Sequence, residues 1–488
     1  MLHAGKLVYL CIIERTPDLN LMDQDSTGMN NDTIIALATP YGIGAIAVIR
    51  LSGEKAIELA SEFFESRRKG KILSDQASHT VHLGLIREGE RILDEVLATV
   101  FRAPHSYTGE NVVEISCHGS TYIQREILNL FLKHGARHAD AGEFTLRAFL
   151  NGKMDLSQAE AVADVIASDS AASHEIALQQ MRGGFSSEIA ALRDQLVHFA
   201  SMIKLELDFV EEDVEFADRA QFQELIHKIR QVVKRLVDSF ALGNVLKNGI
   251  PVAIVGEPNV GKSTLLNALL NEEKAIVSDI AGTTRDAIED EMILNGVSYR
   301  FIDTAGIRET SDVVENIGIR KTFENIEKAQ LVLQLIDGEK IDLNQVETEV
   351  NQLADKYSRK KILTLVNKAD RISSEDRTAL AEKHPDWLLI SAKTKEGIDL
   401  LLQHLAELVN TGALSNQQTV VSNSRHFEAL TKSLEALNEV QKGMDQEISS
   451  DLLAIDIRQA LYHLGEITGE ITTDDLLGNI FANFCIGK

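Results

Sequence analysis

The stretch Gly256-Glu-Pro-Asn-Val-Gly-Lys-Ser263 decides the fold of the central part of this chain. It fits G-x-x-x-x-G-K-[ST], the pattern of a phosphate-binding P-loop, in which glycines let successive backbone N–H groups point at a phosphate. The apolar residues 252–255 predict a buried strand before it, and residues 264–270 predict the helix that follows. In such a loop Lys262 reaches the β- and γ-phosphates and Ser263 ligates Mg²⁺. The alternative, a chance match in a glycine-containing turn, explains neither the strand nor the helix.

A second motif concerns the base. Asn367-Lys-Ala-Asp370 follows an apolar run and fits N-K-x-D. Asp370 is expected to accept two hydrogen bonds from guanine, a donor pair that adenine lacks, while Asn367 and Lys368 brace the loop and lie along the base. Residues 388–393 predict a further strand and loop, where a backbone N–H near Ala392 meets the guanine O6. Alone, N-K-x-D is equally a polar strand end; after a P-loop it predicts a guanine nucleotide.

Two loops between these motifs are predicted to sense the γ-phosphate. One is Asp303-Thr-Ala-Gly306, where Asp303 is expected to hold Mg²⁺ through water and the Gly306 N–H to touch the γ-phosphate. The other is the polar loop 279–286, in which Thr284 is the candidate for the second hydroxyl ligand of Mg²⁺. We expect both loops to be switches, ordered by the γ-phosphate and released on hydrolysis.

The residue that orients the attacking water is missing from its usual place. Ras-like enzymes carry a Gln directly after this glycine, and here Ile307 stands there, which cannot hydrogen-bond. No arginine finger is marked by the sequence either. Asn259 inside the P-loop has two interpretations: its amide oxygen coordinates a monovalent cation near the β- and γ-phosphates, or it tightens the loop through an Asx hydrogen bond. The residues alone leave both open.

Length, charge and cysteine content limit the choice of function. The 488 residues predict two to four domains, and the formal charge of −25 argues against binding nucleic acid through charge alone. A specific RNA contact would need a local Lys/Arg cluster or a second protein with a basic surface. The three cysteines are too few for a disulfide framework, and no apolar run approaches 18 residues. We therefore expect a cytoplasmic protein without a transmembrane helix.

The order of patterns along the chain predicts the domains. Residues 1–28 are expected to be a disordered extension, with Met29 a candidate initiator. Mixed strands and helices in residues 29–150 predict an α+β domain. Helical periodicity covers residues 151–248 and returns in 411–488, around the P-loop domain at 249–410. The predicted fold class is multidomain α/β and α: a P-loop domain, its mostly parallel sheet flanked by helices on both faces, inserted into a helical domain.

Further motifs are spread over residues 30–488. They are Thr39-Pro-Tyr-Gly-Ile-Gly-Ala45 with Arg50, Tyr107-Thr-Gly-Glu110, Gly142-Glu-Phe-Thr-Leu-Arg-Ala-Phe-Leu-Asn-Gly-Lys153, Asp155-Leu-Ser-Gln-Ala-Glu-Ala161, Ile467-Thr-Gly-Glu470 and Cys485-Ile-Gly-Lys488. Together with the P-loop they resemble the TrmE-type family of bacterial tRNA uridine-5-carboxymethylaminomethyl modification GTPases. The resemblance implies a homodimer whose N-terminal domain, residues 29–150, binds tetrahydrofolate and dimerises.

The resemblance also implies cofactor contacts. It places Arg50, Glu110, Lys153 and Lys488 around the folate, where Arg or Lys suits the glutamate carboxylate and Glu110 suits the amide-like edge of the pterin. Each of them alone reads as a surface or cap residue. Cys485 lies near the folate site in the family, and either a catalytic thiol or simple packing accounts for it.

Potassium activation is a further implication of the resemblance. Asn259 becomes a K⁺ ligand together with the carbonyls of Ser278 and Ile280 and with Thr283, at a place where two GTPase domains meet. Glu315 orients the attacking water through a second water. The expected catalytic residues are Lys262, Thr284, Gly306 and Glu315. The expected GTP-binding residues are Asn259, Val260, Gly261, Lys262, Ser263, Thr264, Ser278, Asp279, Ile280, Ala281, Gly282, Thr283, Thr284, Asp303, Thr304, Ala305, Gly306, Asn367, Lys368, Asp370, Ser391, Ala392 and Lys393.

The predicted function is GTP hydrolysis coupled to tRNA modification. By resemblance, the cycle of the dimer drives addition of a carboxymethylaminomethyl group to C5 of the wobble uridine, position 34, of certain tRNAs. A 5-formyl- or methylene-tetrahydrofolate supplies the one-carbon unit, and an FAD-dependent partner subunit completes a heterotetramer. FAD and NADH belong to that partner, because no Rossmann fingerprint is present here. The rival prediction is a ribosome-assembly GTPase that binds rRNA, which would leave the folate motifs unexplained and lacks a visible KH signature.

Overall fold

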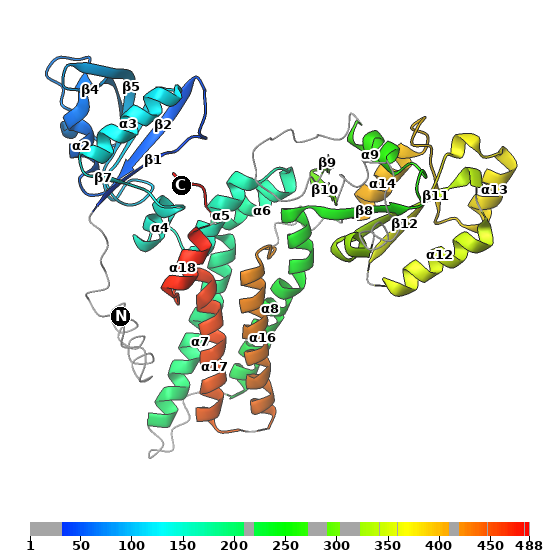
Figure 1. Ribbon diagram of the computed structural model, residues 1–488. Helices are drawn as coiled ribbons and strands as arrows, with labels where there is room; N and C mark the ends of the chain where they lie inside the picture. The colour runs from blue at the N-terminus through cyan, green and yellow to red at the C-terminus, as the bar shows by residue number, and fades with distance from the viewer. Residues whose placement is uncertain are drawn as a thin grey trace. The chain divides into compact units, whose positions relative to one another are not determined.

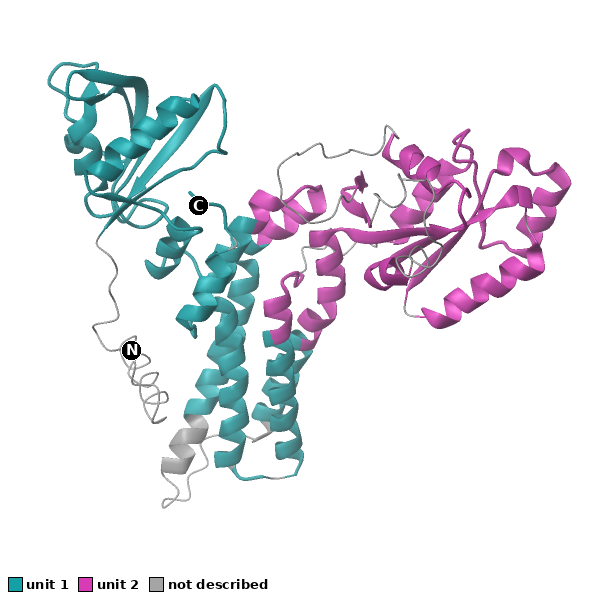
Figure 2. Ribbon diagram, viewed as in Figure 1, with its two compact units in different colours: residues 1–163, 180–233, 429–488 teal, residues 164–179, 234–428 magenta. Residues whose placement is uncertain are grey.

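The structure is a computed structural model that describes residues 32–208, 219–271, 290–302, 323–340, 342–358, 360–408, 419–446, 448–482 and 484–487 (Figure 1). The predicted extension, residues 1–28, lies outside these ranges. The chain divides into two compact units (Figure 2): residues 1–163, 180–233 and 429–488 form the first, and residues 164–179 and 234–428 form the second. Each unit is built around its own sheet or helix packing.

A seven-stranded sheet forms the N-terminal part of the first unit, in the order β3-β4-β5-β6-β2-β1-β7. Every neighbouring pair is antiparallel except β1 and β7. The strands are β1 (Thr33–Leu37), β2 (Ile46–Ser52), β3 (Phe64–Ser66), β4 (Thr80–Glu88), β5 (Arg91–Phe101), β6 (Val112–His118) and β7 (Ala136–His138).

Helices α2 (Ala56–Phe63) and α3 (Thr121–Lys133) cover one face of this sheet (Figure 1). Side chains alternate along each strand, so Ile49, Val100 and Ile115 turn inward and share a core with Ile127 and Phe131 of α3. The residues between them, at positions such as 46, 48, 50 and 52 on β2, lie on the opposite face. This second face, which α2 and α3 leave uncovered and on which Phe144 packs against Ile34 and Ala36, carries the N-terminal candidate residues.

The two helical segments that flank the P-loop domain in sequence pack together. Helix α7 packs against α17, and α8 is joined to α16 by Arg230 and by a stack of Phe240 on Phe427. The helices are α4 (Glu143–Leu150), α5 (Leu156–Ala167), α6 (Ala171–Met181), α7 (Gly184–Asp208), α8 (Arg219–Asn248), α16 (Ser424–Asp445), α17 (Ser450–Thr468) and α18 (Asp474–Phe481), with a 3₁₀ turn η1 (Leu73–Asp75) in the N-terminal part. None of the helices in the described ranges is long and apolar enough to span a bilayer.

The second unit holds a six-stranded sheet in the order β13-β12-β11-β8-β10-β9, parallel except for β9. Its strands are β8 (Ile250–Gly256), β9 (Asp290–Leu294), β10 (Val297–Phe301), β11 (Leu331–Asp337), β12 (Lys361–Asn367) and β13 (Leu388–Leu389). Its helices are α9 (Lys262–Leu270), α12 (Leu343–Lys356), α13 (Ser374–Lys383) and α14 (Ile398–Leu408), with 3₁₀ turns η3 (Gly338–Lys340) and η4 (Ala369–Arg371).

Helices cover both faces of this sheet, as the predicted fold class requires. Along β8, Val252 and Ile254 belong to a core that includes α9 and α14, whereas Ala253 and Val255 belong to a core on the other face, against which Leu353 of α12 packs. A strand buried on both faces reads as a continuous apolar run, which is the pattern at residues 252–255. The carboxyl ends of β8, β11, β12 and β13 meet at one edge, where ligands bind in open α/β sheets.

Candidate functional site

The P-loop connects β8 to α9 through two crowded glycines. Gly256 and Gly261 have φ of +149° and +106°, and a Cβ at Gly256 would lie 2.4 Å from the Leu335 carbonyl oxygen. A Cβ at Gly261 would lie 2.3 Å from the Asn367 Nδ2. Only glycine fits these positions. Between them Asn259 has a φ of +62°, a left-handed conformation that asparagine tolerates well.

Lys262 folds back over this loop. Its Nζ donates to the carbonyl oxygens of Gly256 at 2.7 Å and Glu257 at 2.9 Å, and burial lowers the pKa of the ammonium. Ser263 and Thr264 follow in the first turn of α9, whose unpaired N–H groups and dipole favour a bound anion. The Lys262 ammonium and the N-terminus of α9 therefore lie together at this loop, as a bound triphosphate requires.

Asn367 ties three loops together from the end of β12. Its side chain is only 3% exposed. Its Nδ2 donates to the Val260 carbonyl oxygen at 2.7 Å, and its Oδ1 accepts from the Ala392 N–H at 3.0 Å. The brace expected from the sequence thus reaches both the P-loop and the loop after β13. One amide fixes the distance between the phosphate side and the base side of the site.

Asp370 presents an exposed carboxylate at the base side. The buried Ser391 hydroxyl donates to its Oδ1 at 2.6 Å and lowers the pKa of the carboxyl, with smaller contributions from Arg371 and Lys393. The Thr394 N–H in turn donates to the Ser391 hydroxyl oxygen at 3.3 Å. The carboxylate is therefore ionised at neutral pH and held in place, ready to accept from a donor pair such as that of guanine.

Lys368 has a partner that sequence analysis did not identify. Its Nζ lies 2.6 Å from Oδ2 of Asp337, the last residue of β11. The signal was the mostly apolar stretch 331–336, broken by Gln334 and followed by an acidic residue, because the carboxyl end of a central parallel strand lies at the ligand edge of the sheet. The structure places five predicted residues together at this edge of the sheet, on its loops or at the start of α9. They are Lys262, Asn367, Lys368, Asp370 and Ser391.

The remaining nucleotide and metal predictions lie outside the described residues. Hairpin β9–β10 runs between the two predicted switch segments, since β9 begins at Asp290 and β10 ends at Phe301. The residues concerned are Ser278, Asp279, Ile280, Ala281, Gly282, Thr283, Thr284, Asp303, Thr304, Ala305, Gly306, Ile307 and Glu315. Of the predicted K⁺ and Mg²⁺ ligands, the structure describes Asn259 and Ser263.

A second candidate site lies on the uncovered face of the N-terminal sheet. Arg50 on β2 pairs with Glu114 at 2.8 Å, and its guanidinium carbon lies 5.4 Å from the ring centroid of Tyr107 and 5.5 Å from that of Phe144. The same guanidinium donates to the Gly487 carbonyl oxygen at 3.4 Å. The Phe144 ring is fully buried, whereas the Tyr107 ring is partly exposed. The Arg50 cation beside the Tyr107 ring is suited to an aromatic ligand that carries a negative group.

The C-terminal segment reaches this face. Ile486 forms an antiparallel bridge with Ala141, and Gly487 has a φ of +96°. A Cβ at Gly487 would lie 2.2 Å from the Leu37 carbonyl oxygen at the end of β1. The predicted folate residue Lys488 lies outside the described residues, directly after this contact.

Glu110 belongs to a network of charged side chains. Its carboxylate accepts from the Ser52 hydroxyl at 2.7 Å and lies 3.2 Å from the Arg147 guanidinium. Arg147 also contacts Asp32 at 2.7 Å and Glu143 at 2.9 Å. Since Arg50 and Ser52 lie two residues apart on β2, Arg50 and Glu110 border the same sheet face.

Two carboxyls of this network, those of Asp32 and Glu143, are held ionised. Burial by itself would raise the pKa of Asp32 and of Glu143, but hydrogen bonds from Arg137 and Arg147 outweigh it, and both pKa values lie below their ordinary ones. Arg137 contacts Asp32 and Glu143 at 2.6 Å each. The network therefore depends on charge, unlike the amide and hydroxyl contacts around Asn367.

Lys153, the third predicted folate residue, lies beside the loop that leads to Glu110. Its Nζ donates to the Pro104 carbonyl oxygen at 2.9 Å, and its stem lies 3.4 Å from where a Cβ on Gly109 would be. The structure thus places Arg50 and Glu110 on one face and Lys153 next to the 104–110 loop that borders it.

The two described thiols differ in accessibility. Cys117 is buried, and burial raises its pKa to about 11, which makes it unreactive. Cys485 is exposed, next to the segment that contacts the sheet. Cys11 lies outside the described residues. Cys485 is therefore the accessible thiol of the two.

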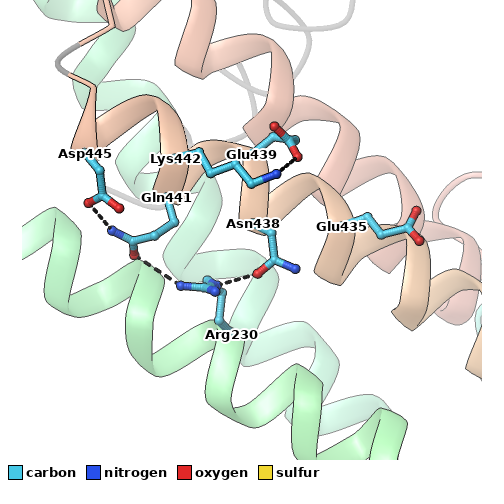
Figure 3. A pocket seen from close by; sticks show the side chains of 7 residues that line it. All are labelled: Arg230, Glu435, Asn438, Glu439, Gln441, Lys442 and Asp445. Carbon is cyan, nitrogen blue, oxygen red and sulfur yellow. Dashed lines mark hydrogen bonds and ion pairs between the residues drawn. The ribbon is translucent and has the colours of Figure 1, made fainter.

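A hollow of about 650 Å³ between α8 and α16 matches no sequence motif (Figure 3). In it the Arg230 guanidinium donates to Oδ1 of Asn438 at 2.8 Å and to Oε1 of Gln441 at 3.4 Å, and Lys442 pairs with Glu439. Its polar side chains mostly bond to one another along and between the helices, as Figure 3 shows. We interpret it as a polar contact region that joins α8 to α16.

Comparison with known proteins covers most of the chain. The model of the GTP-binding protein TrmE N-terminus matches residues 33–153, and that of the MnmE helical domain matches residues 156–485. The protein named tRNA modification GTPase MnmE from Christiangramia forsetii is 63% identical over 472 residues, 94% of this chain and 99% of that one. Proteins of the same name from Flavobacterium johnsoniae and Bacteroides fragilis are 61% and 51% identical, each covering 94% of this chain and 100% of the relative.

These matches agree with the geometry of the second unit. Its sheet, its P-loop and its Asn-Lys-x-Asp loop are those of a GTP-binding protein, and the chain is a GTPase. The resemblance drawn from the sequence is confirmed, as is the predicted fold class of an α+β N-terminal part, a helical part and a P-loop part. The chain belongs to the MnmE family of tRNA modification GTPases.

Proposed function

We propose that this GTPase couples hydrolysis of GTP to addition of a carboxymethylaminomethyl group at C5 of the wobble uridine, position 34, of certain tRNAs. The observation that supports GTP binding is the buried Asn367 amide, which joins the P-loop to the loop after β13. The family membership carries the role in tRNA modification. The finer chemistry at the uridine is our extension of both.

For GTP we propose the residues at the edge of the parallel sheet. Lys262 and the α9 N-terminus would hold the phosphates, Ser263 and Thr284 would ligate Mg²⁺, and Asp370 would accept from guanine. A K⁺ ion would sit at Asn259, with Ser278, Ile280 and Thr283 as further ligands. The place of Asn259 in the P-loop, between the two glycines and beside the proposed phosphate site, supports this. Glu315 would orient the attacking water.

For a tetrahydrofolate we propose the uncovered sheet face around Arg50 and Glu110. The donor set fits such a ligand: a guanidinium suits its carboxylate, the partly exposed Tyr107 ring suits its aromatic part, and a carboxylate suits its amide-like N–H edge. The bound cofactor would supply the one-carbon unit. This chain's own residues would bind and orient it, with Lys153 and Lys488 from flanking segments.

For a homodimer we propose an apolar strip on the same sheet face. Leu83 on β4 pairs in register with Leu97 on β5, and they are 50% and 45% exposed; Ile46 on β2 is 67% exposed. Exposed apolar patches of this kind mark contact surfaces. A second copy of the chain is the occupant that the family resemblance implies, and it would bring two GTPase domains into one assembly.

We further propose the domain organisation and the partner. Residues 29–150 would be the folate-binding and dimerisation domain, 151–248 with 411–488 the helical domain, and 249–410 the inserted GTPase domain. An FAD-dependent subunit would join the dimer in a heterotetramer and supply much of the tRNA contact. The formal charge of −25 supports this division, since it disfavours RNA binding by this chain alone.

Nucleoside analysis of tRNA tests the proposal. Cells that lack this gene should lose the modified wobble uridine and regain it with the wild-type gene, but not with Lys262→Ala, which removes the phosphate-binding ammonium. A variant in the polar contact region between α8 and α16, Glu435→Gln, serves as the matched control and should restore the modification. Normal modified uridine in the deletion strain together with immature ribosomal RNA would instead favour a ribosome-assembly GTPase.

A further inference from the structure

Asp337 is held between two partners at the carboxyl end of β11. Its Oδ1 accepts from the Glu339 N–H at 3.1 Å, and its Oδ2 lies 2.6 Å from Nζ of Lys368. The Asp337 and Lys368 side chains are 14% and 24% exposed, so solvent screens their attraction less than it would at the surface. The carboxylate is thus fixed from the backbone side and bound to one ammonium.

The backbone brings these two side chains together. Strands β11 and β12 run parallel, with Asp337 directly opposite Asn367, so Lys368 is the next residue beyond the pair. Lys368 has a φ of +63°, an uncommon conformation for a side-chain-bearing residue. A Cβ on Gly338 would lie 2.8 Å from the Asn367 carbonyl oxygen, which shows how closely the two loops approach. The pairing of β11 with β12 therefore brings the Asp337 and Lys368 side chains next to each other.

A nearby acid provides an internal comparison. Glu339 lies 4.0 Å from the Lys368 ammonium but 2.8 Å from Arg371, and that second pair is exposed. Exposed pairs contribute little, because water and salt screen them. Asp337 is therefore the one close, partly buried anion that the structure places on Lys368 among the described residues.

We infer that Asp337 is a positioning residue for the guanine nucleotide, acting through Lys368. It orders the long lysine side chain between the loop braced by Asn367 and the carboxylate of Asp370 before the base arrives. A flexible side chain loses rotamer freedom when it is fixed on a ligand, so fixing it in advance strengthens binding without any new contact to the ligand. The inference rests on the proposed role of residues 367–370 in binding the base.

A double-mutant cycle with Asp337→Asn and Lys368→Met tests this coupling. Calorimetry would measure the Kd of the full-length protein for GDP, and steady-state kinetics would measure KM and kcat for GTP. Each single variant should raise the Kd for GDP by about tenfold, and the double variant should bind no more weakly than Lys368→Met alone. The kcat at saturating GTP should stay within about twofold of wild type, because positioning affects binding in the ground state and transition state alike.

The control is Glu339→Gln, which removes the neighbouring exposed acid and should leave the Kd unchanged. Wild-type affinity in Asp337→Asn, or strictly additive effects in the double variant, would overturn the inference. A Tm drop with loss of kcat in Asp337→Asn would do the same, because it indicates a structural role. If Lys368→Met and Asp370→Asn both bind GDP like wild type, base recognition itself fails. A weak Lys368→Met beside a normal Asp337→Asn refutes only the role of Asp337.

Discussion

The nucleotide edge of the parallel sheet and the uncovered face of the N-terminal sheet are assembled by different forces. Around Asn367 the loops are joined by a neutral amide and backbone groups. Around Arg147 the segments are joined by ion pairs, with Arg147 and Arg137 among the carboxylates of Asp32, Glu110 and Glu143. We expect nucleotide binding at the first region to depend on the position of the Asn367 amide. We expect the stability of the second region to depend on its ion pairs.

Sheet topology accounts for this difference. In the second unit, parallel strands end at the same edge, so short loops meet there without long-range charge. In the first unit, Arg147 on α4 must reach Asp32, 115 residues earlier in sequence, and Glu110, 37 residues earlier. Charged side chains are long enough to connect such segments.

Removing the central cation should produce the largest effect. Arg147→Met keeps most of the side-chain volume but leaves the Asp32, Glu110 and Glu143 carboxylates close together without it, and breaking such a buried network costs about 3–5 kcal/mol. Chemical denaturation would measure the free energy of unfolding. Arg67→Met, at an exposed ion pair with Glu95, is the matched control and should change little. Equal losses in both variants would refute the comparison.

Removing the central amide should act on the nucleotide. Asn367→Ala leaves the Val260 carbonyl and the Ala392 N–H without their partner, at about 1–3 kcal/mol for each buried group. We expect the affinity for GDP to fall by about 30-fold or more, measured by calorimetry. Asn344→Ala, at an exposed position on α12, should bind GDP normally. An Asn367→Ala variant of unchanged affinity would show that the loops hold their spacing without the amide.

The proposed K⁺ site at Asn259 gives a further test at the nucleotide edge. We expect GTP turnover to rise at least about tenfold when Na⁺ is replaced by K⁺, and Asn259→Ala to lose that rise. Initial rates at matched ionic strength would measure it. Equal rates in the two salts would contradict the proposed K⁺ site and leave Asn259 as a loop-tightening residue.

Lowering the pH should produce the smallest of these effects, a decline in Tm that depends on the charged network. The pKa values of Asp32 and Glu143 are lowered in the folded protein, from ordinary values of 3.8 and 4.5. Their contribution to stability is therefore present above those ordinary values and is lost as pH falls through the lower, folded ones. The Tm should decline below about pH 4.5 and decline less steeply in Arg147→Met. A parallel pH profile in that variant would show that other carboxyls dominate.

The sequence motifs predicted the loops that the structure brings together at the nucleotide edge, because spacing and topology agree there. An apolar run followed by a glycine-rich or Asn-Lys-x-Asp loop implies a strand end, and strand ends of a parallel sheet lie together. Asp337 was missed because it belongs to no motif. Strand β9 and its turn into β10 were also not predicted, although Asn295-Gly296 is the typical two-residue turn between strands and both residues have positive φ.

The N-terminal site was less predictable for a physical reason. Ion pairs between segments as far apart as Asp32 and Arg147 leave no period in the sequence, so the network around Arg147 could not be read from it. Arg50, Glu110 and Lys153 were predicted from the family resemblance alone. The contact of Gly487 with β1 had no local signal, because a glycine near a chain end is ordinary.

That contact has a practical consequence for experiments. At Gly487 there is room for a hydrogen atom but none for a methyl group against the Leu37 carbonyl oxygen, and the adjoining Ile486 is bridged to Ala141. An affinity tag or fluorescent reporter joined beyond residue 487 would disturb the contact of Gly487 with Leu37 and the hydrogen bond from Arg50 to Gly487. Labels intended to leave the proposed cofactor face undisturbed should be placed elsewhere, for instance on the exposed surface of α12.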